Sequence, residues 1–178
     1  DDAAHLPLTR KILERPRVLE RIRESMAHPA AAHLTCVMVT ELERKLALAL
    51  GLPIYGCDPA LQQWGSKSGS RRVFREAQVE LPFGFEDLRD ADDLARALVE
   101  LKAQRPQLRK AVVKLNEGFS GEGNALFDFA YAPGGKALLA WVRRRLPALA
   151  CEARDMSWEQ YEAKFQVMGG IVEEFIHG

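Results

Sequence analysis

Residues 111–124, AVVKLNEGFSGEGN, carry the strongest structural signal in the chain. An apolar run contains one lysine, Lys114, and is followed by a loop with three glycines and a serine. Apolar residues return at 125–129, so the pattern predicts a strand, a flexible loop and a second strand. Glycine lets backbone N–H groups approach an anion closely and lysine adds a positive charge, so this hairpin suits a polyphosphate. In a P-loop the lysine instead follows the glycines and opens a helix.

Composition limits the function classes. The 25 Lys and Arg residues balance the 25 Asp and Glu residues, so there is no electrostatic case for binding nucleic acid or a membrane surface. Three widely spaced cysteines without a C-x-x-C pair argue against a disulfide framework or a zinc site. No apolar run approaches the ~20 residues of a membrane span and no signal peptide is recognisable, so we expect a cytoplasmic protein.

The rest of the chain predicts alternating helices and strands. In the N-terminal third, the order strand, helix, strand indicates a parallel βαβ unit, whose helix begins with the capping box Thr40-Glu41-Leu42-Glu43 and ends at Gly51. The other expected elements are a helix over 16–26, a buried strand over 34–39, a short strand over 52–56, a short helix from 58, helices over 67–77 and 92–102, an extended segment over 82–85, helices over 136–149 and 158–167, and a closing strand over 171–176. We therefore expect a mixed α/β (α+β) fold with two domains.

Lys114 is the first candidate for chemistry. A lysine within an apolar strand must reach water, pair with a carboxylate or meet a bound anion, because leaving it buried and unpaired is costly. A salt bridge to Glu117 or Glu173 would satisfy it without any ligand. The adjacent glycine loop favours phosphate binding over that alternative.

Two consecutive carboxylates, Glu173 and Glu174, interrupt the closing apolar strand. Successive side chains of a strand point to opposite faces, so the two cannot share one core. One of them could accept a hydrogen bond from an exocyclic amine while neighbouring backbone groups bind the ring edge. The alternative is an exposed edge strand that uses charge to avoid aggregation, and the spacing does not choose between the two.

The segment GSKSGSRR, residues 65–72, is a polar start to a helix. Backbone donors, hydroxyls and positive charges gather there, as an anion site at a helix N-terminus requires, although a solvated N-cap explains the same residues. Other chemistries lack their motifs. The chain has no G-x-S-x-G elbow, and no set of histidines and carboxylates has metal-ligand spacing, so we expect no metal site among these residues.

Together these segments resemble the ATP-grasp family, and more closely its carboxylate–amine ligases related to the peptide ligase of pheganomycin biosynthesis. Members of that subgroup carry runs similar to KSGSR (67–71), VKLNEG (113–118), SGEGN (120–124) and GGIVEE (169–174). The similar runs are spread over most of the chain. One departure is Gln78, where many relatives have glycine at the turn after the first helix.

The resemblance implies a partial pre-ATP-grasp βαβ domain, residues 1–64, followed by the nucleotide-binding part of an ATP-grasp fold, residues 65–178. Lys67 and Lys114 are similar to the two phosphate-binding lysines of the family. The residues similar to the mobile loop over the phosphates are Ser120, Gly121, Glu122, Gly123 and Asn124. Glu173 would accept from the adenine amine, Glu174 and Ile176 would offer backbone groups to the adenine edge, and Phe175 would alternate away.

The resemblance further implies an ATP-dependent ligase that activates a small-molecule or peptide carboxylate as an acyl-phosphate and joins it to an amine. It implies Mg²⁺ as a cofactor with ligands beyond Gly178, so we expect no turnover by this chain alone. The main alternative is a non-catalytic nucleotide-binding module that acts as a sensor or scaffold. A third is an interaction domain in which Lys114 and Glu173 merely pair. The sequence names neither the substrates nor the oligomeric state.

Overall fold

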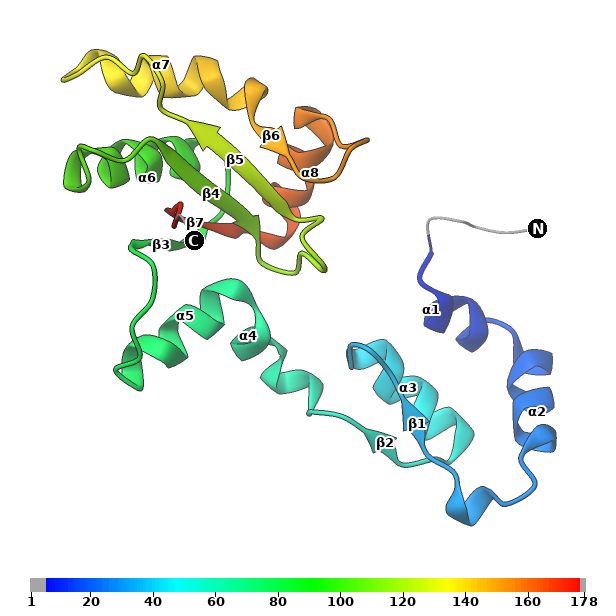
Figure 1. Ribbon diagram of the computed structural model, residues 1–178. Helices are drawn as coiled ribbons and strands as arrows, with labels where there is room; N and C mark the ends of the chain where they lie inside the picture. The colour runs from blue at the N-terminus through cyan, green and yellow to red at the C-terminus, as the bar shows by residue number, and fades with distance from the viewer. Residues whose placement is uncertain (1–5, 177–178) are drawn as a thin grey trace. The chain divides into compact units, whose positions relative to one another are not determined.

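A computed structural model of the chain describes residues 6–176. The chain divides into two compact units, Asp1–Gln63 and Trp64–Gly178, drawn together in Figure 1. A mixed helix-and-sheet architecture was expected from the sequence, and it is confirmed. The identification of the first unit as a partial pre-ATP-grasp domain stays a prediction.

The first unit contains the predicted parallel βαβ arrangement. Leu34 of β1 pairs with Ile54 of β2, and α3 connects the two strands. The Thr40 amide donates to Glu43 Oε2 at 2.9 Å, and Gly51 ends α3 with φ +69°, which confirms both the capping box and the glycine cap. The elements are α1 (Leu8–Leu13), α2 (Pro16–Ser25), η1 (Pro29–Ala31), β1 (Leu34–Thr35), α3 (Glu41–Leu50), β2 (Ile54–Tyr55), η2 (Pro59–Leu61) and α4 (Gln62–Gly65), the last at the boundary of the units.

The buried strand predicted over 34–39 is wrong in length and in burial. β1 stops at Thr35, and Val37 is 92% exposed. The partner strand β2 is only two residues long, so residues after Thr35 have no ladder to join. A β-branched apolar run indicates a strand, but the paired length depends on the neighbouring strand.

The second unit is built on a five-stranded sheet in the order β3-β7-β4-β5-β6, and each neighbouring pair is antiparallel. The strands are β3 (Gly84–Leu88), β4 (Lys110–Leu115), β5 (Asn124–Asp128), β6 (Ala150–Cys151) and β7 (Gly170–Glu174). The predicted hairpin is therefore present as β4 and β5. The strand predicted over 171–176 ends at Glu174, and the two-residue strand β6 was not predicted.

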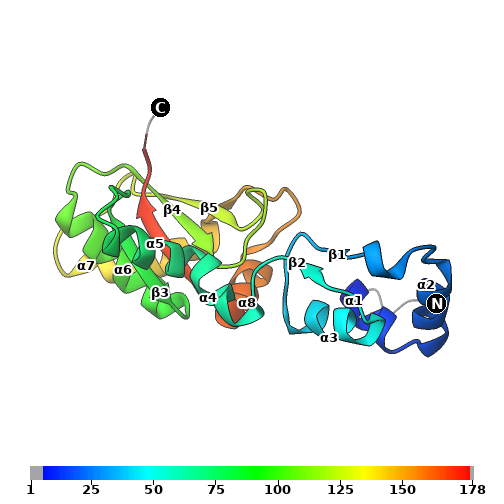
Figure 2. The same ribbon diagram turned by 90° about the horizontal axis from the view of Figure 1, so that it is seen from below.

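Three helices cover one face of this sheet, and a fourth helix packs on the opposite face. The helices are α5 (Lys67–Glu76), α6 (Ala91–Gln104), α7 (Ala137–Arg145) and α8 (Trp158–Met168). Leu98 of α6, Val142 of α7 and Phe165 of α8 share a core with Val113 and Val172 of the sheet (Figure 1 and Figure 2). Because side chains alternate along a strand, Lys114 and Glu173 point to the opposite face, where α5 packs.

Helix α7 is shorter than the predicted 136–149. It ends at Arg145, and a 3₁₀ turn, η3 (Leu146–Ala148), follows. Pro147 lies in this turn. A proline within a longer helix would lack an N–H and would clash with the carbonyl four residues earlier, so the helix cannot continue regularly through it.

Helix α5 ends in a Schellman motif at Gln78. Its backbone φ is +55°, in the left-handed region, and the Val79 amide donates to the Phe74 carbonyl at 2.9 Å. The Gln78 amide donates to the Arg75 carbonyl at 3.1 Å. Glycine normally occupies this position because it has no Cβ to clash. The glutamine noted as a departure from the family pattern therefore sits in a conformation that favours glycine.

We expect Gln78→Gly to raise the free energy of unfolding by about 1 kcal/mol, since the side chain is exposed and the left-handed strain is relieved. Chemical denaturation measures the change. Gln78→Ala is the matched control, because it removes the side chain and keeps the strain. Equal stability of the glycine and alanine variants would contradict the explanation.

Candidate functional site

An ion pair inside the sheet brings together Lys114 and Glu173. The residue Val112 lies opposite Glu173 and Lys114 lies opposite Ile171, so the two charged side chains are diagonal neighbours on one face. Lys114 Nζ pairs with Glu173 Oε1, and the Glu173 side chain is buried, with 9% of it exposed. This is the salt bridge that the sequence left as an alternative for Lys114. The edge-strand interpretation of Glu173 is wrong, because β7 lies between β3 and β4.

Arg71, from α5, closes the other side of the same carboxylate. Its Nη1 lies 2.9 Å from Glu173 Oε2, its Nε lies 3.1 Å from Glu86 Oε2, and its Nη2 donates to the Pro82 carbonyl at 3.0 Å. Arg71 is only 6% exposed. A buried charge is tolerated where it is paired and hydrogen-bonded. Glu173 thus has a cation on each carboxylate oxygen.

Lys67 reaches the same region from the first turn of α5. Its Nζ donates to the Gly118 carbonyl at 2.8 Å, at the start of the glycine loop. Burial, and next the positive charge of Lys114, lower the pKa of Lys67 from its ordinary value, while Glu117 and Glu173 act in the opposite direction. The fold therefore brings together the two predicted phosphate-binding lysines.

The start of α5 does not offer its backbone donors to a ligand. The Ser68 amide donates to Asn116 Oδ1 at 3.0 Å, the Lys67 amide to the Asn116 carbonyl at 3.2 Å, and the Gly69 amide to Ser66 Oγ at 3.0 Å. Of the two alternatives left open for this segment, the N-cap is the one observed, because side-chain and backbone oxygens of the protein already cap the helix. The Lys67 side chain is what this helix end contributes.

Asn116 is a site residue that the sequence reasoning missed. Besides capping α5, its Nδ2 donates to the Met168 carbonyl at 3.0 Å and its amide donates to the Gly169 carbonyl at 3.0 Å. Asn116 therefore joins the end of β4, the start of α5 and the turn between α8 and β7. Its position two residues after Lys114 was a weak signal, since asparagine in a glycine-rich loop commonly serves the turn itself.

The glycine loop has a defined conformation in this structure. Ser120 and Gly121 have φ values of +51° and +84°, and a Cβ on Gly123 would lie 2.7 Å from the Gly118 Cα. Gly121 is therefore required by its backbone angle and Gly123 by close backbone approach. The Glu122 amide donates to the Phe119 carbonyl at 3.0 Å, and Asn124 Nδ2 donates to Glu152 Oε2 at 3.0 Å. The phosphate-binding role of this loop stays a prediction.

The residues predicted at the adenine edge follow directly on the buried pair. The Glu174 carboxylate accepts from the Phe83 amide at 2.8 Å and lies 3.5 Å from Arg105 Nε, on the face opposite Glu173. The Phe175 amide donates to the Lys110 carbonyl at 3.2 Å, and the Ile176 side chain is 63% exposed. The Glu174 side chain thus has a structural task, and contact of this segment with adenine stays a prediction.

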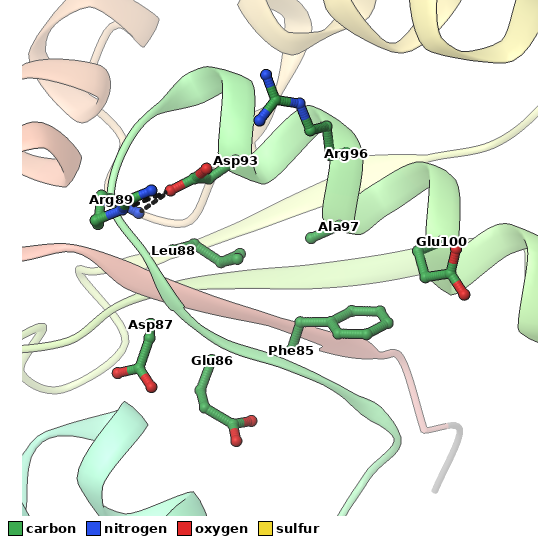
Figure 3. Close-up of a pocket in the computed structure, with 9 residues that line it drawn as sticks. All are labelled: Phe85, Glu86, Asp87, Leu88, Arg89, Asp93, Arg96, Ala97 and Glu100. Carbon is green, nitrogen blue, oxygen red and sulfur yellow. Dashed lines mark hydrogen bonds and ion pairs between the residues drawn. The ribbon is translucent and has the colours of Figure 1, made fainter.

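A separate surface hollow of about 520 Å³ lies between β3 and α6 (Figure 3). Its lining includes Phe85 and Leu88, and it does not include Lys67, Lys114 or Glu173. The view shows Glu86 and Asp87 directed away from α6, toward the α5 side. Hydrogen bonds to Arg71 and Arg72 account for these two carboxylates. We therefore place the candidate site at the lysines and not at this hollow.

Residues 6–176 contain neither a cluster of metal ligands nor a membrane-spanning helix. Within that range, no three or more His, Cys, Asp or Glu side chains are grouped so that they could hold a metal ion. Over the same range, no helix has the length and apolar character needed to cross a membrane.

The chain is similar in sequence to proteins of known family. A family model described as "IQCH-like, ATP-grasp" matches residues 59–146. An L-propargylglycine–L-glutamate ligase of Streptantibioticus cattleyicolor is 27% identical over 175 residues, which cover 96% of this chain and 34% of the ligase. These similarities support the resemblance of the chain to the ATP-grasp superfamily.

The chain matches only part of the length of its other relatives. IQ motif-containing protein H of Danio rerio is 25% identical over 163 residues, covering 91% of the chain but 14% of that protein. The structure of D-alanyl-alanine synthetase A from Vibrio cholerae is similar over 75% of this chain and 32% of its own, with 12% identity and a TM-score of 0.44. The chain thus spans about a third or less of these relatives. The family resemblance is confirmed, and the narrower pheganomycin-type subgroup stays a prediction.

We expect Asn116→Ala to lower the free energy of unfolding by about 1–3 kcal/mol, because the Ser68 amide and the Met168 carbonyl lose their partner. Thermal and chemical denaturation measure the loss. Asn124→Ala removes an asparagine whose hydrogen bond is exposed, and it should cost less than about 1 kcal/mol. Equal effects of the two substitutions would show that Asn116 does not join the three elements.

Proposed function

We propose that this chain is the ATP-binding portion of an ATP-dependent carboxylate–amine ligase. The observation that carries the proposal is the convergence of Lys67 and Lys114, from two separate elements, at the glycine loop. The two neighbouring ammonium groups repel each other, and a bound polyphosphate would stabilise both of them. Similarity to an L-propargylglycine–L-glutamate ligase supports amide-forming chemistry.

In the proposed reaction a carboxylate oxygen attacks the γ-phosphorus of ATP and ADP leaves, which gives an acyl-phosphate. An amine then attacks the acyl carbon, phosphate leaves, and an amide forms after the amine loses a proton. Residues of this chain would bind and orient the nucleotide. Lys67 and Lys114 would neutralise phosphate charge, the loop of residues 120–124 would close over the phosphates, and Glu173 would accept from the adenine amine. Such catalysis depends on positioning and charge stabilisation.

The proposed substrates are a small-molecule or peptide carboxylate and an amine. The superfamily uses ATP with Mg²⁺ in general, but residues 6–176 do not offer a cluster of metal ligands, so we assign no step to the metal here. We place the Mg²⁺ ligands outside these residues and expect no amide formation by this chain alone.

A nucleotide-binding module that acts as a sensor or scaffold is the second candidate. One observation supports the sensor or scaffold. A relative whose match covers 91% of this chain is named IQ motif-containing protein H, and that name does not mention a ligase. Both candidates require the nucleotide site. ADP release dependent on an acid and an amine, measured on a protein that contains this chain and the metal ligands, distinguishes the ligase from the sensor.

Calorimetric titration of Mg·ATP and ADP into this chain tests the site. We expect Lys114→Ala to weaken ATP binding by roughly 1.5–3 kcal/mol, as for other charge-assisted contacts, and Lys67→Ala to weaken it also. Lys110→Ala, an exposed lysine at the other end of β4, is the matched control and should bind ATP normally. Unchanged affinity in the Lys114 variant would rule out its phosphate role.

ATP binding should also depend on pH through Lys67. The pKa of Lys67 lies below its ordinary 10.5 in the free protein, and bound phosphate would raise it by stabilising the ammonium. Affinity is therefore full below the free-protein pKa, falls as pH rises through it, and is accompanied by proton uptake in that window. Titrations in buffers of different ionisation enthalpy measure the uptake. Lys67→Arg should remove it, and uptake that persists in this variant would assign the proton elsewhere.

A further inference from the structure

Arg71 is a buried cation whose hydrogen bonds fix it from three directions. It bonds Glu173, Glu86 and the Pro82 carbonyl through three different nitrogens at 2.9–3.1 Å. Glu86 also pairs with Arg75, so the anchor of Arg71 is itself held. A planar guanidinium held in this way cannot follow a moving carboxylate and instead holds the carboxylate in place.

The two oxygens of Glu173 have different partners. Oε2 bonds Arg71, whose side chain is only 7% exposed, whereas Oε1 bonds Lys114, whose side chain is 27% exposed. Lys114 is also the proposed phosphate ligand. When its ammonium turns to a phosphate, Oε1 loses a donor and Oε2 keeps one. A carboxylate with one oxygen held and one released is oriented to accept a single new hydrogen bond.

We propose that Arg71 is a positioning residue for base selection, which holds Glu173 so that Oε1 accepts from the exocyclic amine of adenine. This inference rests on the proposed ATP-binding function. Adenine carries a donor amine at C6, whereas hypoxanthine carries an acceptor oxygen there. A fixed carboxylate hydrogen-bonds the amine and repels the oxygen, but a carboxylate free to rotate away discriminates poorly.

The test compares binding of ATP with binding of inosine triphosphate. The unsubstituted chain should prefer ATP by about tenfold or more, as expected for one hydrogen bond to a charged group. In Arg71→Met this preference should fall to within about threefold. Arg72→Met is the matched control. Arg72 is the next residue of the same helix, its side chain is 45% exposed, and it pairs with Asp87 and not with Glu173, so its variant should keep the preference.

Arg71→Lys covers the case in which Arg71→Met does not fold. It keeps the positive charge, but an ammonium cannot reproduce the planar fork that bonds Glu173 and Glu86 together, so the ATP preference should again fall. A double-substitution cycle adds a readout that a purely structural role would not change. In a Glu173→Gln background, Arg71→Lys should have no further effect on the ratio of the two affinities, because Arg71 acts through Glu173.

The outcomes separate this inference from the proposed function. If Arg71→Lys keeps the ATP preference, the positioning role is overturned and the nucleotide site stands. Equal binding of ATP and inosine triphosphate by the unsubstituted chain also overturns the inference and leaves nucleotide binding intact. If the chain binds neither nucleotide, the proposed function fails and the positioning role fails with it.

Discussion

A single buried carboxylate, that of Glu173, sets the arrangement of the second unit. Its side chain is only 9% exposed, so its charge must be paired, and its two partners come from β4 and α5. Removing either partner would leave one of the two carboxylate oxygens without its cation. The pair therefore fixes the position of α5 against the sheet, and with it the position of Lys67 at the first turn of that helix.

Asn116 applies a second constraint at the same place. The residue caps α5 with its side-chain oxygen and its backbone carbonyl, and it holds the turn before β7 with its side-chain nitrogen. Lys67, Lys114 and the first glycine of the loop are thereby held within one small region. Preorganised charges of this kind stabilise a ligand without large rearrangement of the protein, which is the general basis of electrostatic catalysis and of anion binding.

Local patterns predicted much of this unit, and long-range contacts account for the rest. The hairpin, the helices and the placement of Lys114 in a strand follow from periodicity and glycine content, and all are present. The roles of Arg71 and Asn116 do not follow from such patterns, since each depends on residues about 50 to 100 positions away in the chain. The choice between an anion site and an N-cap at the start of α5 stayed open in the sequence for the same reason. The sequence does not show which distant residue accepts hydrogen bonds from the first amides of a helix, as Asn116 does for α5. Strand length in β1 failed because it depends on the partner strand.

The pairing of Lys114 with Glu173 would, taken alone, favour a purely structural interpretation of both residues. Lys67 changes the balance. Within residues 6–176 it forms no ion pair, and its hydrogen bond goes to a neutral carbonyl, while burial and a second ammonium disfavour its charge. A structural lysine would gain stability from a carboxylate partner at hydrogen-bond distance, whereas Glu117 and Glu173 only partly offset the effects of burial and of Lys114 on the pKa of Lys67. An anion with several negative charges would relieve Lys67 and compete with Glu173 for Lys114. The two lysines are thus not equivalent: Lys67 would gain a partner on nucleotide binding, whereas Lys114 would exchange one.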